Sequence, residues 1–174
     1  GGCRNDIQAC NSFIGGGISN GINISGLGGY GVIVGGNSNC IAGSSRSYNF
    51  IGNGSTNCIT EADGSVIGSG ASNRIFKGNC NVIITGFNNR VETPTGGCSV
   101  ILAGRANIVS TGHSVIGSGC NNIITGSGLR YHFMGTGCEN IISGSNSYSV
   151  IVGGTLNTGS GNCSFIGGGC LNVI

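Results

Sequence analysis

One pattern, Ile-x-x-Gly-x-x-Asn-x-Ile, recurs ten times along the 174-residue chain with no change in its internal spacing. The first copy begins at Ile14 and the last ends at Ile174, while Val, Met or Gly replaces one Ile in four copies. A fixed repeat of this kind is typical of a solenoid, in which each coil buries a face against the next. We therefore predict one array over residues 1–174, beginning in a partial repeat at Gly2.

The composition and the coil length indicate the fold class. With 38 Gly residues, one Pro and 7% charged residues, the chain is a poor candidate for helix, because Gly costs about 1 kcal/mol relative to Ala there. Successive copies begin 15 to 19 residues apart, and all of this variation follows the second Ile. We predict an all-β fold, a parallel β-solenoid (β-helix or β-roll) of about ten coils, with the variable segments projecting from one corner.

The Gly and Asn of each repeat suit a turn. Gly accepts positive φ, and Asn both tolerates the left-handed region and bonds nearby backbone. At the strand spacing of about 4.8 Å, the Asn side chains of successive coils would bond amide to amide along the axis. This predicted Asn ladder comprises Asn20, Asn39, Asn57, Asn73, Asn89, Asn107, Asn122, Asn140, Asn157 and Asn172.

The residue before the first Ile of each repeat is also apolar, which has a consequence for assembly. Neighbouring residues on a strand point to opposite faces, so one column fills the core and the other points outward. Tyr30, Tyr48, Tyr131 and Tyr148 lie two positions further back, on the same outward face. Such a stripe needs a cover, and a homo-oligomer, for example a trimer around a common axis, supplies one. The alternative is a monomer whose two layers bury both columns.

Segments such as Ser65-Val66-Ile67-Gly68-Ser69-Gly70 and Ser114-Val115-Ile116-Gly117-Ser118-Gly119 carry a family resemblance. They resemble the Ser-x-Ile-x-Gly-Gly-x-x-Asn-x-Ile repeats of phage and large-virus fibre proteins and, more distantly, the heads of trimeric autotransporter adhesins. The resemblance spans essentially the whole chain. It implies a parallel β-solenoid that is usually trimeric and serves as a structural subunit or shaft of a fibre. The expected location is extracellular, at a cell surface or on a virion surface.

Ten cysteines are the most individual feature of the repeats. Six form pairs that share one repeat position in adjacent copies, about one strand spacing apart and within the range that a disulfide tolerates. Packed free thiols are the alternative. The paired residues are Cys40 with Cys58, Cys80 with Cys98, and Cys120 with Cys138. The other four, Cys3, Cys10, Cys163 and Cys170, are candidates for links between subunits, because Cys170 and the next subunit's Cys3 would share a column in an end-to-end stack.

The sequence does not favour an enzyme. Its five acidic residues, Asp6, Glu61, Asp63, Glu92 and Glu139, are far apart along the axis, so no catalytic carboxylate pair is predicted. We predict no catalytic residue, no metal site and no cofactor. The net charge of +2 is scattered and gives no basic stripe for nucleic acid, and no apolar run reaches the roughly 20 residues of a membrane span. The expected partner is therefore the chain itself, in a homo-oligomer or a head-to-tail filament.

A second hypothesis is an adhesin head that binds a host-surface receptor or glycan through the variable loops. The aromatic and basic residues near these loops form the candidate ligand face: Tyr30, Arg46, Tyr48, Arg130, Tyr131, His132 and Tyr148. Ice binding is disfavoured, because the Thr residues do not hold one column.

Overall fold

The computed structural model describes residues 1–26, 28–43, 47–94, 96–127, 131–144 and 148–174. In this part of the chain all regular structure is β-strand, and each repeat contributes one strand to each of two parallel ten-stranded sheets. The odd-numbered sheet consists of β1 (Asp6–Gln8), β3 (Gly21–Ile24), β5 (Cys40–Gly43), β7 (Cys58–Thr60), β9 (Arg74–Phe76), β11 (Arg90–Val91), β13 (Ile108–Val109), β15 (Ile123–Thr125), β17 (Ile141–Ser143) and β19 (Thr158–Gly159). The even-numbered sheet consists of β2 (Phe13–Ile14), β4 (Tyr30–Ile33), β6 (Tyr48–Ile51), β8 (Val66–Ile67), β10 (Val82–Ile83), β12 (Val100–Ile101), β14 (Val115–Ile116), β16 (Phe133–Met134), β18 (Val150–Ile151) and β20 (Phe165–Ile166).

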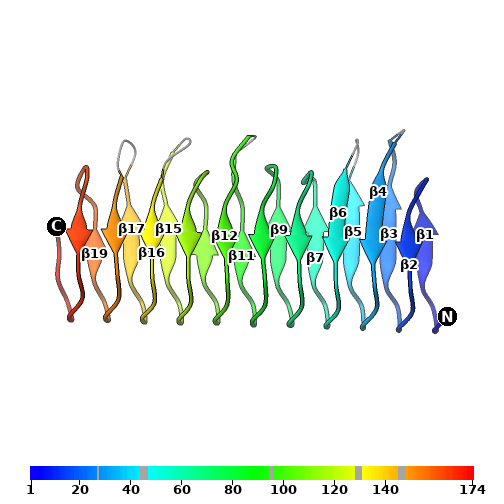
Figure 1. Cartoon of the computed structure of the whole chain (residues 1–174), viewed down its shortest axis with the longest axis horizontal. Coiled ribbons are helices and arrows are strands. Elements are labelled where there is room, and N and C mark those ends of the chain that lie inside the picture. Colours follow the sequence, from blue (N-terminus) through cyan, green and yellow to red (C-terminus); the bar gives the residue numbers. More distant parts are fainter. Residues whose placement is uncertain (27, 44–46, 95, 128–130, 145–147) are drawn as a thin grey trace.

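The predicted parallel β-solenoid is confirmed. Strand order within each sheet follows the sequence, and each strand pairs with the equivalent strand of the next coil, so the chain winds in one direction along a single axis (Figure 1). The register never slips: Ile33 pairs with Ile51, and Ile41 with Ile59. A stack of ten strands at about 4.8 Å spacing is roughly 45 Å long.

The core is a double row of aliphatic side chains between the two sheets. The first Ile of each repeat comes from the even sheet and the second from the odd sheet, and both rows are almost fully buried from Ile22 to Ile151. These side chains become exposed to solvent only at the ends of the array, where Ile7 is 43% exposed and Ile174 is 53% exposed. The prediction that these two columns form the core is therefore confirmed.

The tight turns lie along one edge of the solenoid, which we call the turn edge. Each repeat Gly there has φ between 92° and 117°, as predicted. The ladder Asn itself is not in the left-handed region, although Asn tolerates that conformation. The left-handed residue is the one just before it, for example Ser72 (φ 57°), Ala106 (φ 56°) and Leu156 (φ 56°). That conformation is unfavourable for these residues, so it is held by the bonds that surround it.

The described parts of the variable segments between the odd and even strands lie at the opposite edge, the loop edge (top of Figure 1). This placement follows from the sequence, since all length variation falls between the second Ile and the next first Ile. Within the described residues the structure contains no helix of the length and apolarity needed to cross a membrane.

Candidate functional site

The ten Asn side chains line the turn edge in one continuous row. Each Asn backbone N–H donates to Oδ1 of the Asn in the preceding coil, at 3.0–3.1 Å, and Asn5 of the partial repeat receives the first of these bonds. In nine of the ten, Nδ2 also donates to that oxygen, at 2.9–3.2 Å. The bonds between one Asn and the next are therefore directional: each Asn donates to the Asn of the coil before it and accepts, through Oδ1, from the Asn of the coil after it.

Each interior Asn also bonds forward along the axis. Asn73 Nδ2 donates to the carbonyl oxygen of Gly86 at 2.8 Å, and the same bond recurs from coil to coil. One Asn thus joins its own turn to the coil before and the coil after. The turn Gly leaves no space for a side chain, since a Cβ on Gly70 would overlap the Gly86 oxygen and approach Asn73 Nδ2 to 2.7 Å. The fixed Gly-x-x-Asn spacing is thereby explained.

A second buried polar row, not predicted from the sequence, runs along the loop edge of the core. Its members stand two residues before the first Ile, where six of the ten repeats have Ser. Each bonded side chain accepts a hydrogen bond from the backbone N–H of the equivalent residue one coil later, at 2.9–3.3 Å. The recurring Ser-x-Ile pattern is the feature of the sequence that could have indicated this row. The bonded residues are Ser12, Asn49, Ser65, Asn81, Ser99, Ser114 and His132.

The predicted ligand face is only partly assembled at the loop edge. Tyr30 stacks on Tyr48 with ring centroids 4.9 Å apart, and Tyr131 stacks on Tyr148 at 5.7 Å. All four side chains are exposed. His132 does not belong to this surface: it is 2% exposed, and its Nδ1 accepts the Ser149 N–H at 3.3 Å within the second polar row.

The remaining aromatic and basic residues of this region are placed as follows. His113, which was not among the predicted ligand residues, extends the aromatic row by stacking on Tyr131 at 5.0 Å. Arg46 and Arg130 lie outside the described residues, so the basic part of the predicted face has no structural description.

The outer surface of the even sheet is apolar along the whole array. We call this the apolar face; it consists of the residues on either side of the first Ile of each repeat. One column contains only Phe and Val, and the other only Gly, Val, Ile and Leu. Each Phe of the first column has Gly two residues later. The rings of Phe13, Phe50, Phe133 and Phe165 lie 3.2–3.6 Å from the position that a Cβ of that Gly would occupy.

Because a large Phe always stands beside a Gly, the apolar face has no strongly protruding side chains along these coils. Residues on the face include Val34 (48% exposed), Leu102 (47%) and Val152 (43%). The odd sheet is mixed, because its outer columns contain Asp6, Arg74, Arg90 and several Ser and Thr residues as well as Ile108, Ile123 and Ile141. The two faces of the solenoid therefore have different chemistry.

All ten cysteines are free thiols, so the structure contains none of the predicted disulfides. The predicted pairs are nevertheless neighbours. Cys40 and Cys58 are register partners on β5 and β7, and Cys120 and Cys138 form a parallel bridge at the turn edge. The pKa of Cys98 is raised, mainly by burial and to a smaller extent by a hydrogen bond with Cys80.

The four terminal cysteines are all exposed. Cys3 bridges to Ile18 and Cys170 to Thr155, at opposite ends of the same row of turn-edge bridges. The structure therefore places Cys3 and Cys170 in one column, as an end-to-end link requires. Cys10 and Cys163 lie just ahead of β2 and β20, near the loop edge.

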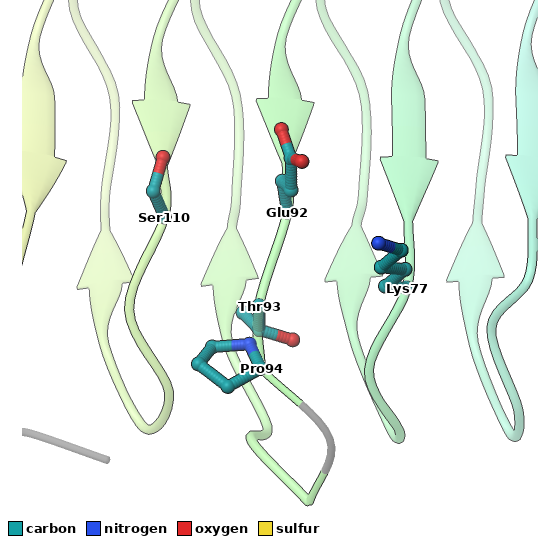
Figure 2. Close-up of a pocket in the computed structure, with 5 residues that line it drawn as sticks. All are labelled: Lys77, Glu92, Thr93, Pro94 and Ser110. Carbon is teal, nitrogen blue, oxygen red and sulfur yellow. The ribbon is translucent and has the colours of Figure 1, made fainter. Parts of the chain in front are cut away.

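A hollow of about 290 Å³ lies near the loop edge, lined by Lys77, Glu92, Thr93, Pro94 and Ser110 from successive coils (Figure 2). Its polar groups are engaged elsewhere. Glu92 pairs with Arg90, the Lys77 ammonium lies 5.0 Å from the Phe76 ring centroid, and Thr93 Oγ1 accepts a bond from Asn81 at 2.9 Å. The sequence reasoning did not single out this hollow, although the only Pro of the chain marks it.

Among the described residues, no group of three or more His, Cys, Asp or Glu side chains has an arrangement that would hold a metal ion. The recurring features are instead two internal polar rows, an apolar face and paired thiols. No protein-family model matches the sequence, and the curated proteins searched give no match.

Proposed function

We propose that this chain is a non-enzymatic structural subunit, or shaft segment, of an extracellular or virion fibre. In this proposal copies associate laterally through the apolar face, as in a trimer, and continue end to end along the solenoid axis. The single observation that carries the proposal is the apolar face, which keeps one chemistry over ten coils.

The size of this face supports association with other copies. An outer surface roughly 45 Å long and about 10 Å wide, three residues along a strand, amounts to about 450 Å². The largest exposed apolar patch on a typical monomer is about 300–600 Å², and it is often a functional surface. Stable interfaces bury about 800 Å² per partner. The exposed Tyr side chains at the adjoining loop edge add area on the same side.

The direction of the Asn ladder supports continuation along the axis. Asn5 Oδ1 accepts from Asn20 in the first step of the ladder, and Asn172 Oδ1 holds the same position in the last coil, where it would accept from a following coil. Contact in register between the last coil of one copy and the first coil of the next would extend the ladder without changing its geometry. A head-to-tail contact that does not close on itself produces a filament.

Light scattering coupled to size-exclusion chromatography tests the lateral contact. We expect the wild type to elute with the mass of several chains. The double variant Leu102→Glu/Val152→Glu should elute at the single-chain mass of 17.2 kDa, because it places charge on the apolar face. The matched control Thr125→Glu/Ser160→Glu changes two exposed positions on the other side of the solenoid and should elute as the wild type does.

Circular dichroism verifies that all three proteins retain β-structure. A wild type that stays at the single-chain mass across protein concentrations contradicts the proposal. Equal dissociation by both double variants would also contradict it, since charge on the odd sheet should not disturb a contact made by the even sheet.

The exposed stacked aromatic row favours a second candidate function, an adhesin head that binds a receptor or glycan. Aromatic side chains at an exposed edge provide rigid contact area for such a ligand. In glycan-array binding we expect Tyr131→Ala/Tyr148→Ala to lose signal and Phe165→Ala, on the apolar face, to keep it. A wild type without signal on the array excludes glycans as the ligand and leaves the fibre role as the proposal.

A further inference from the structure

Cys40 and Cys58 form a thiol pair inside the odd sheet. They are register partners on β5 and β7, so both side chains leave the same face of the sheet on adjacent strands. Parallel neighbours in register have Cα atoms about 4.8 Å apart, within the range that a disulfide tolerates. Both side chains are half-buried, and both are free thiols.

The surroundings of the two sulfur atoms differ. Cys58 Sγ lies 3.2 Å from Thr60 Oγ1, and the next strand places Arg74 directly beside Cys58 in register. Cys40 has Gly21 as its partner on the other side, so no cation lies next to it in the column. Two further charged residues lie in the same column: Asp6 is two coils before Cys40, and Arg90 is two coils after Cys58. Glu61 follows Thr60 directly in the sequence.

These contacts separate the acidities of the two thiols. The hydrogen bond from Cys40 lowers the pKa of Cys58 to about 6, with help from the Thr60 hydroxyl and the Arg74 charge and against the effect of burial. The same hydrogen bond, together with burial, raises the pKa of Cys40. These opposite shifts favour a thiolate on Cys58 over one on Cys40. The turn-edge pair also has a cation beside it, since Arg105 Nη2 donates to Cys120 Sγ at 3.5 Å, but there burial and then the contact with Cys120 raise the pKa of Cys138.

We propose that Cys58 is the nucleophile of a thiol–disulfide exchange site that takes small disulfides as its substrate class, with Cys40 as the resolving thiol. The Cys58 thiolate attacks one sulfur of a disulfide RSSR, releases RS⁻ and forms a mixed disulfide. Cys40 then loses its proton and attacks the Cys58 sulfur, which releases a second thiolate. The net reaction converts two protein thiols and RSSR into the Cys40–Cys58 disulfide and two RSH. The proposal does not depend on the assembly described above.

The test uses two matched proteins. In one, the other eight cysteines are replaced by Ser so that only Cys40 and Cys58 remain; in the other, only Cys120 and Cys138 remain. With glutathione disulfide under argon at pH 7, the first protein should release two glutathione molecules per chain and keep no adduct. Adding Cys40→Ala should trap one glutathionyl group on Cys58, and adding Cys58→Ala should abolish rapid release.

Iodoacetamide alkylation as a function of pH supplies the second measurement. At pH 6 a thiol with a pKa near 6 is half ionised, against roughly one in a thousand for a pKa near 9, and its lower intrinsic nucleophilicity reduces this advantage to about twentyfold. We expect Cys58 in the Cys40/Cys58 protein to react at least about twentyfold faster at pH 6 than Cys138 of the Cys120/Cys138 protein, whose pKa is raised above the ordinary thiol value. In the Cys40→Ala variant this rate difference should shrink.

If replacing eight cysteines prevents folding, the wild type is labelled with substoichiometric iodoacetamide at pH 6 and its peptides are analysed by mass spectrometry. Cys58 should carry most of the label. Labelling spread evenly over the ten cysteines, equal rates in the two matched proteins, or a trapped adduct on Cys40 would each overturn the proposal.

Discussion

Removing one amide from the middle of the Asn ladder tests the physical basis of the fold. Asn73 Oδ1 accepts the Asn89 backbone N–H at 3.0 Å and Asn89 Nδ2 at 3.2 Å. Asn73 Nδ2 donates to Asn57 Oδ1 at 3.1 Å and to Gly86 O at 2.8 Å. In Asn73→Ala, the Asn89 backbone N–H loses its acceptor within a fully buried residue.

The size of this loss follows from counting which groups retain a partner. Gly86 O still accepts from Ala71 N, and Asn89 Nδ2 still donates to Gly104 O. The Asn89 N–H has no such substitute and costs about 1–3 kcal/mol, to which the lost side-chain bonds add about 1 kcal/mol. We therefore expect Asn73→Ala to lower the free energy of unfolding by about 2–4 kcal/mol.

Asn172→Ala is the matched control at the end of the array. Its Nδ2 bonds to Asn157 Oδ1 at 2.9 Å and to Gly168 O at 3.0 Å, but the residue is exposed and water can replace both bonds. We expect a loss below about 1 kcal/mol. Urea unfolding followed by far-ultraviolet circular dichroism measures both variants, and hydrogen exchange should show faster opening around Asn89 in Asn73→Ala. Equal losses at the two positions would refute the stacking argument and leave only a local turn preference.

Three further predictions concern the core, the turn and the second polar row. Ile124→Asp buries an unpaired charge and should destabilise the fold by several kcal/mol. The next residue of β15, Thr125, is exposed, so Thr125→Asp should change the thermal midpoint little. Similar midpoints for the two variants would contradict the assignment of the core face. Gly70→Ala should destabilise more than Gly21→Ala in urea unfolding, because only the first Cβ meets other atoms within 4 Å. Ser114→Ala removes the acceptor of the buried His132 N–H and should cost about 1–3 kcal/mol by the same assay, so a silent substitution would remove the second row as a source of stability.

The sequence predicted the fold and the register because both depend on the invariant part of the repeat. An unchanged spacing from the first Ile to the second allows only one in-register stack, and the side-chain period of two on a strand then determines which columns face inward. For the same reason the exposed Phe column and the position of the variable loops were predictable. Ile14 and Ile166 belong to one column, and only their places near the ends make them differ from fully buried Ile101.

Three features depend on atomic detail that the repeat spacing does not contain. The left-handed residue precedes the ladder Asn because the amide group is needed for bonds between coils, and a residue such as Leu156 adopts φ 56° under that constraint. His132 was predicted to lie on the ligand face from its basic and aromatic neighbours, but its position two residues before the first Ile makes it part of a buried row. The recurring Ser at this position indicated that row, yet its hydrogen bonds became evident only once the coils were stacked.

Cryo-electron microscopy of the purified wild-type protein tests the central proposal most directly. A fibre subunit should appear as several solenoids in contact through their even sheets, and end-to-end contact should give rods longer than the roughly 45 Å of one ten-strand stack. The apolar face should then be covered, and the Asn ladder should run without interruption from one copy into the next. Separate single solenoids about 45 Å long, with Phe13, Leu102 and Phe165 still exposed to solvent, would contradict the account.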